Sequence, residues 1–210
     1  DDPERPSIPD EGDKEEPKPD EDENVTGTLA FEDIWPSGGD YDMNDVIVEY
    51  ERKVYFDKKN IVTKIVDEFT PVHDGATYVN AFAYQIDAAQ IGDKITLPEG
   101  AILEKETSSI IVMSNAKQNI GNKYVVTREF NGSFLKNQLL SYNPYIIVKY
   151  SQGEQNRTEV HLPKHKATAY ANQSLIGSND DAYYIDRKGA YPFAIDIPML
   201  GFTPVTERNR

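Results

Sequence analysis

An acidic turn near the start of the chain carries the residues with the clearest chemistry. Asp40, Asp42 and Asn44 alternate along the chain, so a turning backbone can direct three hard oxygen ligands toward one point. The same spacing opens many calcium-binding loops. Crowded carboxylates repel one another, and a divalent cation such as calcium removes that repulsion. The acidic turn, residues 32–45, contains Glu32, Asp33, Asp40, Asp42, Asn44 and Asp45.

A metal-free hairpin is the alternative interpretation of the acidic turn. Asp and Asn side chains in turns also accept hydrogen bonds from nearby backbone N–H groups. Gly38 and Gly39 lie between two apolar runs, Leu29–Phe31 and Val46–Tyr50, that predict a strand on either side of the turn. Trp35 is expected to cover the turn rather than to lie exposed and stack on a sugar.

Other candidate sites give weaker signals. His161 and His165 would form a zinc pair only on a helix, and Pro163 between them disfavours a helix, so we expect histidines with satisfied hydrogen bonds. The Asn-Asp-Asp triplet at 179–181 is a second acidic turn that could add a metal ligand, with a plain loop as the default interpretation. The chain has no Gly-x-Ser-x-Gly, phosphate-loop, dinucleotide-binding or His-Glu-x-x-His motif, so we predict that it is not an enzyme.

Composition restricts the class of protein. The chain has 210 residues, enough for one sizeable core, and its net charge of -14 argues against a nucleic-acid partner, which requires a basic surface. The absence of cysteine leaves no disulfide and no thiolate metal site. No apolar run approaches the ~20 residues that span a bilayer.

The composition changes near residue 24. Residues 1–24 contain twelve acids, three bases and five prolines, with Ile8 as the only aliphatic residue. Such a segment buries too little apolar area to offset its ordering entropy. We therefore predict a disordered, acidic and proline-rich linker at 1–24 and a β-sandwich domain at 25–210.

From residue 25 onward, short runs rich in β-branched and aromatic residues alternate with turn signals such as Asp-Gly and Asn-Gly. The pattern predicts an all-β, antiparallel β-sandwich of nine or more strands, with a jelly-roll order as one option. Bulky and small residues alternate from Tyr78 to Ile86, which is typical of a central strand covered on both faces. Only residues 133–140 indicate a helical turn. The expected strands are 46–56, 60–69, 77–87, 108–113, 123–130, 145–150, 157–162, 182–186 and 193–197.

The stretch FEDIWPSGGDYDMNDVIVEY at 31–50 resembles the LruC-type domain, a bacterial family of unknown function found mostly in secreted or lipid-anchored surface proteins. VHLPKHKAT at 160–168 and YPFAIDIP at 191–198 are similar to two further segments of that family. The signature in the acidic turn is also similar to that of bacterial surface domains thought to bind calcium. The resemblance implies calcium ligands at Asp33, Asp40, Asp42, Asn44 and Asp45.

The same resemblance implies a protein exported to the bacterial cell surface, either secreted or attached to the outer membrane. Membrane attachment would occur only through a lipid anchor removed before Asp1, with the acidic linker as a spacer. Family members often continue past the position of Arg210, so a shortened chain is expected.

Three functions remain open from the sequence. The first is a non-catalytic, calcium-stabilised surface β-sandwich that binds a glycan or a protein in adhesion, which the 13 tyrosines favour. The second is a structural module of a larger surface assembly, which would have no exposed aromatic patch. The third is a carbohydrate-active hydrolase, which requires a cleft lined by two carboxylates away from the metal. We expect the first.

Overall fold

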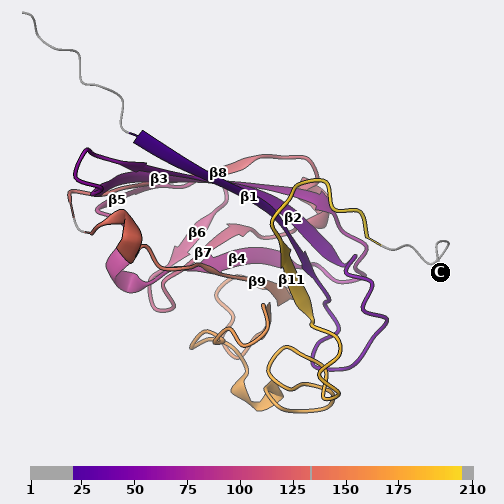
Figure 1. Ribbon diagram of the computed structural model, residues 1–210. Coiled ribbons are helices and arrows are strands. Elements are labelled where there is room, and N and C mark those ends of the chain that lie inside the picture. Colours follow the sequence, from indigo (N-terminus) through magenta and orange to yellow (C-terminus); the bar gives the residue numbers. More distant parts are fainter. Residues whose placement is uncertain (1–20, 133, 205–210) are drawn as a thin grey trace, which may run out of the picture.

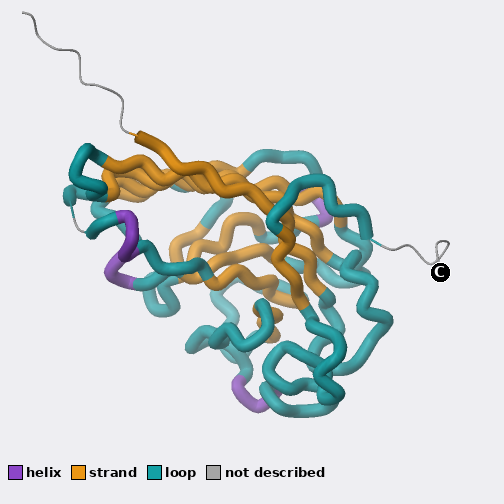
Figure 2. The backbone as a smooth tube through the Cα atoms, in the orientation of Figure 1, coloured by secondary structure: helices purple, strands orange, loops and turns teal. Residues whose placement is uncertain are grey.

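The computed structural model describes residues 21–132 and 134–204 and consists of two antiparallel β-sheets packed face to face (Figure 1). The first sheet has six strands in the order β11-β1-β2-β3-β8-β5, and the second has five in the order β10-β9-β4-β7-β6. Loops and turns connect the strands, with few helical segments (Figure 2). The predicted antiparallel β-sandwich is confirmed.

The first sheet contains β1 (Glu21–Phe31), β2 (Val46–Phe56), β3 (Val62–His73), β5 (Lys94–Thr96), β8 (Tyr124–Glu129) and β11 (Ala194–Ile197). The second contains β4 (Ala81–Gln85), β6 (Ile102–Glu104), β7 (Ser109–Met113), β9 (Asn143–Val148) and β10 (Thr158–His161). The short 3-10 helices are η1 (Ala88–Gln90), η2 (Lys117–Asn119), η3 (Lys136–Gln138) and η4 (Gln173–Leu175). In the described part of the chain, no helix has the length and hydropathy needed to cross a membrane.

The main core lies between the sheets. Phe31 and Phe69 of the first sheet pack on Phe82 of the second, with ring centroids 6.3 and 5.1 Å apart. The second sheet is also buried on its other face, where Ala83 of β4 joins a separate apolar cluster with Tyr145. Strand β4 lies between β9 and β7, as predicted for a central strand with one bulky and one small face.

Two expectations from the sequence differ from the structure. Residues 182–186 do not form a strand, because Tyr183 and Tyr184 have φ angles of 67° and 65°, which a pleated strand cannot accommodate. Strand β1 begins at Glu21, before the expected domain boundary at residue 25, because pairing with β2 uses backbone groups and needs no apolar side chains. The remainder of the predicted linker, residues 1–20, lies outside the described residues.

The long connection from β10 to β11 lies against the face of the second sheet that points away from the first sheet (Figures 1 and 2). Thr168 in this connection donates two hydrogen bonds to Glu159 of β10, and the ring of Tyr184 lies 5.3 Å from that of His161. The connection then reaches the acidic turn between β1 and β2. Polar side chains are therefore buried between the second sheet and this connection.

Candidate functional site

The acidic turn joins the end of β1 to the start of β2. Tyr41 and Met43 have φ angles of 52° and 55°, so the backbone leaves the pleated conformation at two points between the acids. The resulting turn carries Asp40 and Asp42 back toward Glu32, the first residue after β1. Local backbone geometry thus brings together acids from both ends of the turn.

Three carboxylates converge in the acidic turn. Glu32, Asp40 and Asp42 each place one oxygen within 4.8 Å of the others. Ligands on opposite sides of a calcium ion, each at about 2.3–2.6 Å, lie about 5 Å apart, so this separation fits a shared ion. Glu32 is 1% exposed, and its Oε1 accepts a hydrogen bond from the Met43 N–H at 2.5 Å. Burial, together with the charges of Asp45, Asp42 and Asp40, raises the pKa of Glu32 to about 7.

The other predicted ligands lie beside the converging acids and make hydrogen bonds of their own. Asn44 Nδ2 donates to Asp42 Oδ2 at 2.6 Å, and the Asp33 N–H donates to Asp45 Oδ2 at 2.8 Å. Burial and the nearby charges of Asp33 and Asp42 raise the pKa of Asp45 to about 6. Glu32, which the predicted ligand set omits, directly follows an apolar strand-like run. That position is the signal that could have identified it.

Two buried oxygen atoms without partners lie near Asp33. Asn80 Nδ2 donates to Asp33 Oδ2 at 2.8 Å, whereas Oδ1 of the same buried amide accepts no hydrogen bond from any described residue. Asp74 Oδ2 is likewise buried without a partner in the described part of the chain. Burial raises the pKa of Asp74, while Lys117, whose Nζ lies 3.8 Å from Asp74 Oδ1, opposes that shift. Orphaned buried oxygens of this kind are atoms that a cation can satisfy.

The second acidic turn holds the first one through hydrogen bonds. Asp180 Oδ2 accepts the Gly38 N–H, and Asp181 Oδ1 accepts the Trp35 Nε1–H, both at 2.8 Å. Trp35 is 4% exposed, and its ring centroid lies 4.8 Å from that of Tyr184. Trp35 therefore covers the acidic turn, as predicted, and has no exposed face for a sugar.

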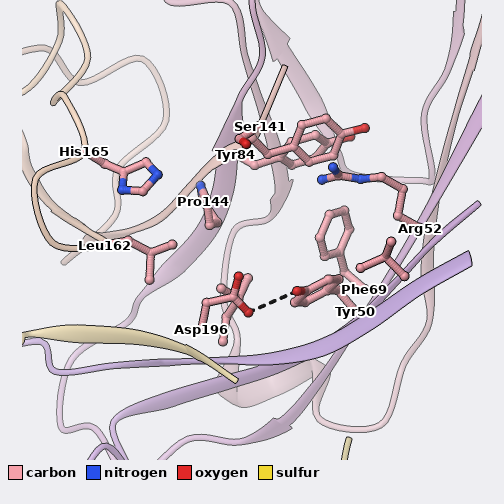
Figure 3. Close-up of a pocket in the computed structure, with 12 residues that line it drawn as sticks. Tyr50, Arg52, Phe69, Tyr84, Ser141, Pro144, Leu162, His165 and Asp196 are labelled. Carbon is pink, nitrogen blue, oxygen red and sulfur yellow. Dashed lines mark hydrogen bonds between the residues drawn. The ribbon is translucent and has the colours of Figure 1, made fainter. Parts of the chain in front are cut away.

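A cleft of about 300 Å³ lies between the two sheets (Figure 3). Tyr50 and Phe69 of the first sheet face Tyr84 and Pro144 of the second, and His165 lies on the side formed by the connection after β10. The cleft is thus lined mainly by aromatic and apolar side chains, as is common in ligand sites.

Several polar groups of the cleft bind neighbouring side chains. The Tyr50 hydroxyl donates to Asp196 Oδ1 at 3.0 Å, and burial with the Asp196 charge raises the pKa of Tyr50 to about 12. Arg52 Nε lies 3.0 Å from Asp67 Oδ1, and its guanidinium lies 3.0 Å from the centroid of the Tyr142 ring. The Tyr142 hydroxyl also donates to Asp67, at 2.7 Å.

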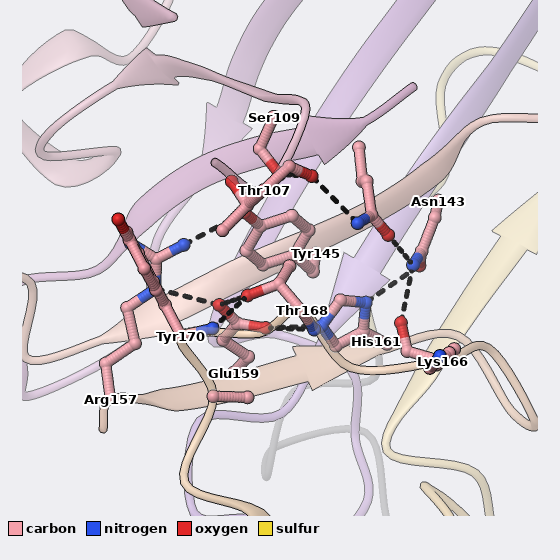
Figure 4. A network of polar contacts seen from close by, with 12 residues as sticks. Thr107, Ser109, Asn143, Tyr145, Arg157, Glu159, His161, Lys166, Thr168 and Tyr170 are labelled. Carbon is pink, nitrogen blue, oxygen red and sulfur yellow. Dashed lines mark hydrogen bonds and ion pairs between the residues drawn. The ribbon is translucent and has the colours of Figure 1, made fainter. Parts of the chain in front are cut away.

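An outer-face network of charged side chains lies on the far side of the second sheet (Figure 4). Arg157 Nη1 lies 2.6 Å from Glu104 Oε1, and Arg157 Nε lies 2.8 Å from Glu159 Oε1. Burial acts to raise the pKa of Glu159, but hydrogen bonds from His161 and Thr168 and the charge of Arg157 lower it below its ordinary value. Thr168 belongs to the connection after β10, so its hydrogen bonds to Glu159 attach this connection to the second sheet.

The two histidines after residue 160 lie in different surroundings. His161 is buried, with Nδ1 2.7 Å from Asn143 Oδ1 and Nε2 2.9 Å from Glu159 Oε2. His165 Nδ1 instead lies 3.4 Å from the Pro163 carbonyl oxygen, at the cleft. The expectation of a histidine with satisfied hydrogen bonds is therefore confirmed for His161.

Comparison with known proteins assigns the family. Residues 104–209 match the sequence model of "Domain of unknown function (DUF4842)". The chain belongs to the DUF4842 family. The matched DUF4842 region contains the outer-face network and the Ser141–Pro144 and Leu162–His165 walls of the cleft, whereas the acidic turn precedes it. A search of curated proteins found no match.

One solved structure shares the fold of this DUF4842 protein. It is the crystal structure of a "Putative lipoprotein from Bacteroides ovatus", with a TM-score of 0.61 and 17% sequence identity. The alignment covers 85% of this chain but 66% of that one, so the DUF4842 chain spans less than two thirds of the length of this neighbour. At this identity the likeness concerns the fold alone.

Proposed function

We propose that this DUF4842 chain is a non-catalytic, calcium-stabilised β-sandwich of the bacterial cell surface that binds a glycan or a protein ligand. The observation that carries the calcium part is the convergence of Glu32, Asp40 and Asp42 within 4.8 Å, with Glu32 buried. The resemblance of residues 31–50 to LruC-type domains supports the same assignment. The role of the ion in this proposal is architectural.

Calcium would be held by the three converging carboxylates, and oxygen atoms of Asp33, Asn44 and Asp45 lie nearby to add ligands. A bound divalent cation lowers the repulsion that raises the pKa of Glu32. It would thereby hold the ends of β1 and β2 together at the point where the second acidic turn attaches. The orphaned oxygens of Asp74 and Asn80 fit a cation-binding region in the same part of the fold.

Location and ligand binding have separate support. The structural neighbour is described as a lipoprotein, which supports a surface-anchored or secreted protein. Tyr50, Tyr84 and Tyr142 line the cleft, which supports a binding module over a purely structural one. Asp196 is the single carboxylate among the lining residues, which favours binding over hydrolysis by a carboxylate pair.

Calorimetric titration of calcium chloride into chelator-treated protein tests the proposal. We expect saturable binding in the parent, loss of that binding in Asp42→Asn, and unchanged binding in Glu99→Gln, an acid in the exposed loop between β5 and β6. No saturable heat in the parent, or equal affinity in the parent and Asp42→Asn, would contradict the calcium site.

A further inference from the structure

Strand β1 has an open edge along the first half of its length. Strand β2 pairs with all of β1, but β11 pairs only with residues 28–31. Pro198 follows β11 and has no N–H group to continue the ladder, which explains why the pairing ends there. Within the described residues, 21–27 therefore have a neighbouring strand on one side only.

The open edge borders the cleft. Val25 and Leu29 of β1 line the cleft together with Tyr50 of β2, and Val25 is 47% exposed. The ring of Tyr50 lies against Gly27. A Cβ atom added to Gly27 would lie 2.5 Å from the Tyr50 hydroxyl, so a larger residue would not fit at this position. Backbone hydrogen-bonding groups and an apolar hollow thus lie side by side, within reach of one extended ligand.

The chemistry of the cleft favours an apolar side chain over a sugar. Sugar recognition depends on polar groups that can exchange their hydrogen bonds with water for bonds with the ligand. The Tyr50 hydroxyl is already bonded to Asp196, and Arg52 is paired with Asp67. The remaining walls are mostly aromatic and aliphatic, which suits a large apolar anchor residue.

The rim around the open edge is acidic. Asp22 and Asp196 are exposed, and Glu51 is half-buried on the strand next to β1. Two acids of the rim are paired, because Lys53 Nζ lies 3.1 Å from Glu51 Oε1 and Lys136 Nζ lies 3.1 Å from Glu23 Oε2. Asp22 and Asp196 form no salt bridge with any described residue, so they carry the negative charge of the rim. With a net charge of -14 on the whole chain, this rim complements a ligand that carries positive charge.

We propose that the open edge of β1 binds an extended, basic segment of a partner protein by strand addition, with one large apolar side chain in the cleft. This inference rests on the binding half of the proposed function and names the class of its partner. The segment pairs with residues 21–27 on the side that β11 leaves open, so backbone bonds provide affinity. Alternate side chains face the cleft, and lysine or arginine residues between them face the acidic rim.

The test uses the full chain with calcium present and the probe peptide acetyl-Lys-Val-Lys-Phe-Lys-Val-Lys-amide. A control peptide of the same sequence carries N-methyl groups on all of its backbone nitrogens, which removes the strand-pairing donors on both edges. We expect saturable binding of the probe, with amide chemical-shift changes at 21–27 and at the cleft, and at least about tenfold weaker binding of the control.

Two substitutions of equally exposed valines provide the matched comparison. Val25 and Val79 are 47% and 48% exposed, and only Val25 borders the cleft. We expect Val25→Arg to weaken probe binding at least about tenfold and Val79→Arg to leave it within about twofold. Asp196→Lys provides a second variant, which should weaken binding by reversing a charge on the rim.

Equal binding of the probe and the N-methylated peptide would overturn strand addition, and so would equal binding by the parent and Val25→Arg. Absence of probe binding would also overturn it. A neutral oligosaccharide that shifts the cleft resonances, without any peptide binding, would preserve the binding function while refuting this partner class. Loss of calcium binding in the separate titration would affect the metal half of the proposed function only.

Discussion

Two regions of this protein bury carboxylates, and they balance that charge differently. In the outer-face network, Arg157 pairs with both Glu104 and Glu159, and hydrogen bonds lower the pKa of Glu159. In the acidic turn, Glu32 and Asp45 form no salt bridge with any described residue, and their pKa values rise to about 7 and about 6. The first region carries its own cation, Arg157, whereas we propose that calcium from solution balances the charge of the second.

The largest expected effect comes from removing the cation of the balanced region. Arg157→Ala leaves the buried carboxylate of Glu159 and the partly buried carboxylate of Glu104 without their guanidinium, which should lower the free energy of unfolding by about 3–5 kcal/mol. Urea unfolding with and without calcium measures this loss, which should be the same in both buffers. Lys94→Ala, which removes an exposed pair with Glu129, should cost under about 1 kcal/mol. Equal losses in the two variants would refute this account of the network.

The pH dependence of stability should have opposite signs in the two regions. The pKa of Glu32 is about 7 in the folded protein against an ordinary 4.5. In the presence of chelator and between these two pH values, the folded protein therefore holds a proton that the unfolded chain releases. The contribution of Glu32 to the free energy of unfolding is fully present at acidic pH. It falls by up to about 3 kcal/mol as pH rises to about 8. The lowered pKa of Glu159 instead gives stability above its ordinary pKa that is lost in acid.

Chemical unfolding of the parent and Glu32→Gln in chelator, across this pH range, isolates the effect of Glu32. Gln keeps the acceptor for the Met43 N–H but cannot ionise. The difference in unfolding free energy between the two proteins should therefore change with pH, in favour of the variant as pH rises. A difference that stays constant across the range would show that Glu32 titrates normally.

The smallest expected effect concerns the contact that holds the two acidic turns together. Trp35→Phe removes the hydrogen bond to Asp181 Oδ1, but the Tyr184 N–H still donates to that oxygen at 2.6 Å. We expect a loss of about 1 kcal/mol in unfolding free energy. Tyr191→Phe, at a residue that is 54% exposed, should change it by under about 0.5 kcal/mol. A loss above about 3 kcal/mol in Trp35→Phe would indicate that the contact does more than join two loops.

Much of the fold follows from local sequence patterns. Strand β2 has the predicted bounds of 46–56, because its apolar and aromatic residues fit a half-buried pleat. Strands β5 and β6 have three residues each, too few for a periodic signal. The first residues of β1 look like linker, because their pairing depends on β2 and on backbone groups alone.

The sites were predictable only where their members are close in sequence. Alternation indicated that Asp40 and Asp42 converge, but Glu32 joins them through the geometry of the hairpin. Arg157, Glu159 and His161 also alternate, so one face of a strand could have been recognised as charged. The partner Glu104 is contributed by β6, at the opposite edge of the second sheet, and no local pattern predicts such a contact.

The proposed dependence of the acidic turn on a cation is tested most directly by the melting temperatures of the parent and Glu32→Gln at about pH 8, each with chelator and with excess calcium. In chelator the variant should melt higher, because it removes a buried charge that its neighbours repel. With calcium at about a thousandfold excess over its dissociation constant, the parent should gain about 4.1 kcal/mol. This gain exceeds the roughly 3 kcal/mol that the charge of Glu32 costs at this pH, so the parent should melt higher than the variant. The same order of melting temperatures in both buffers would contradict a calcium site at the acidic turn.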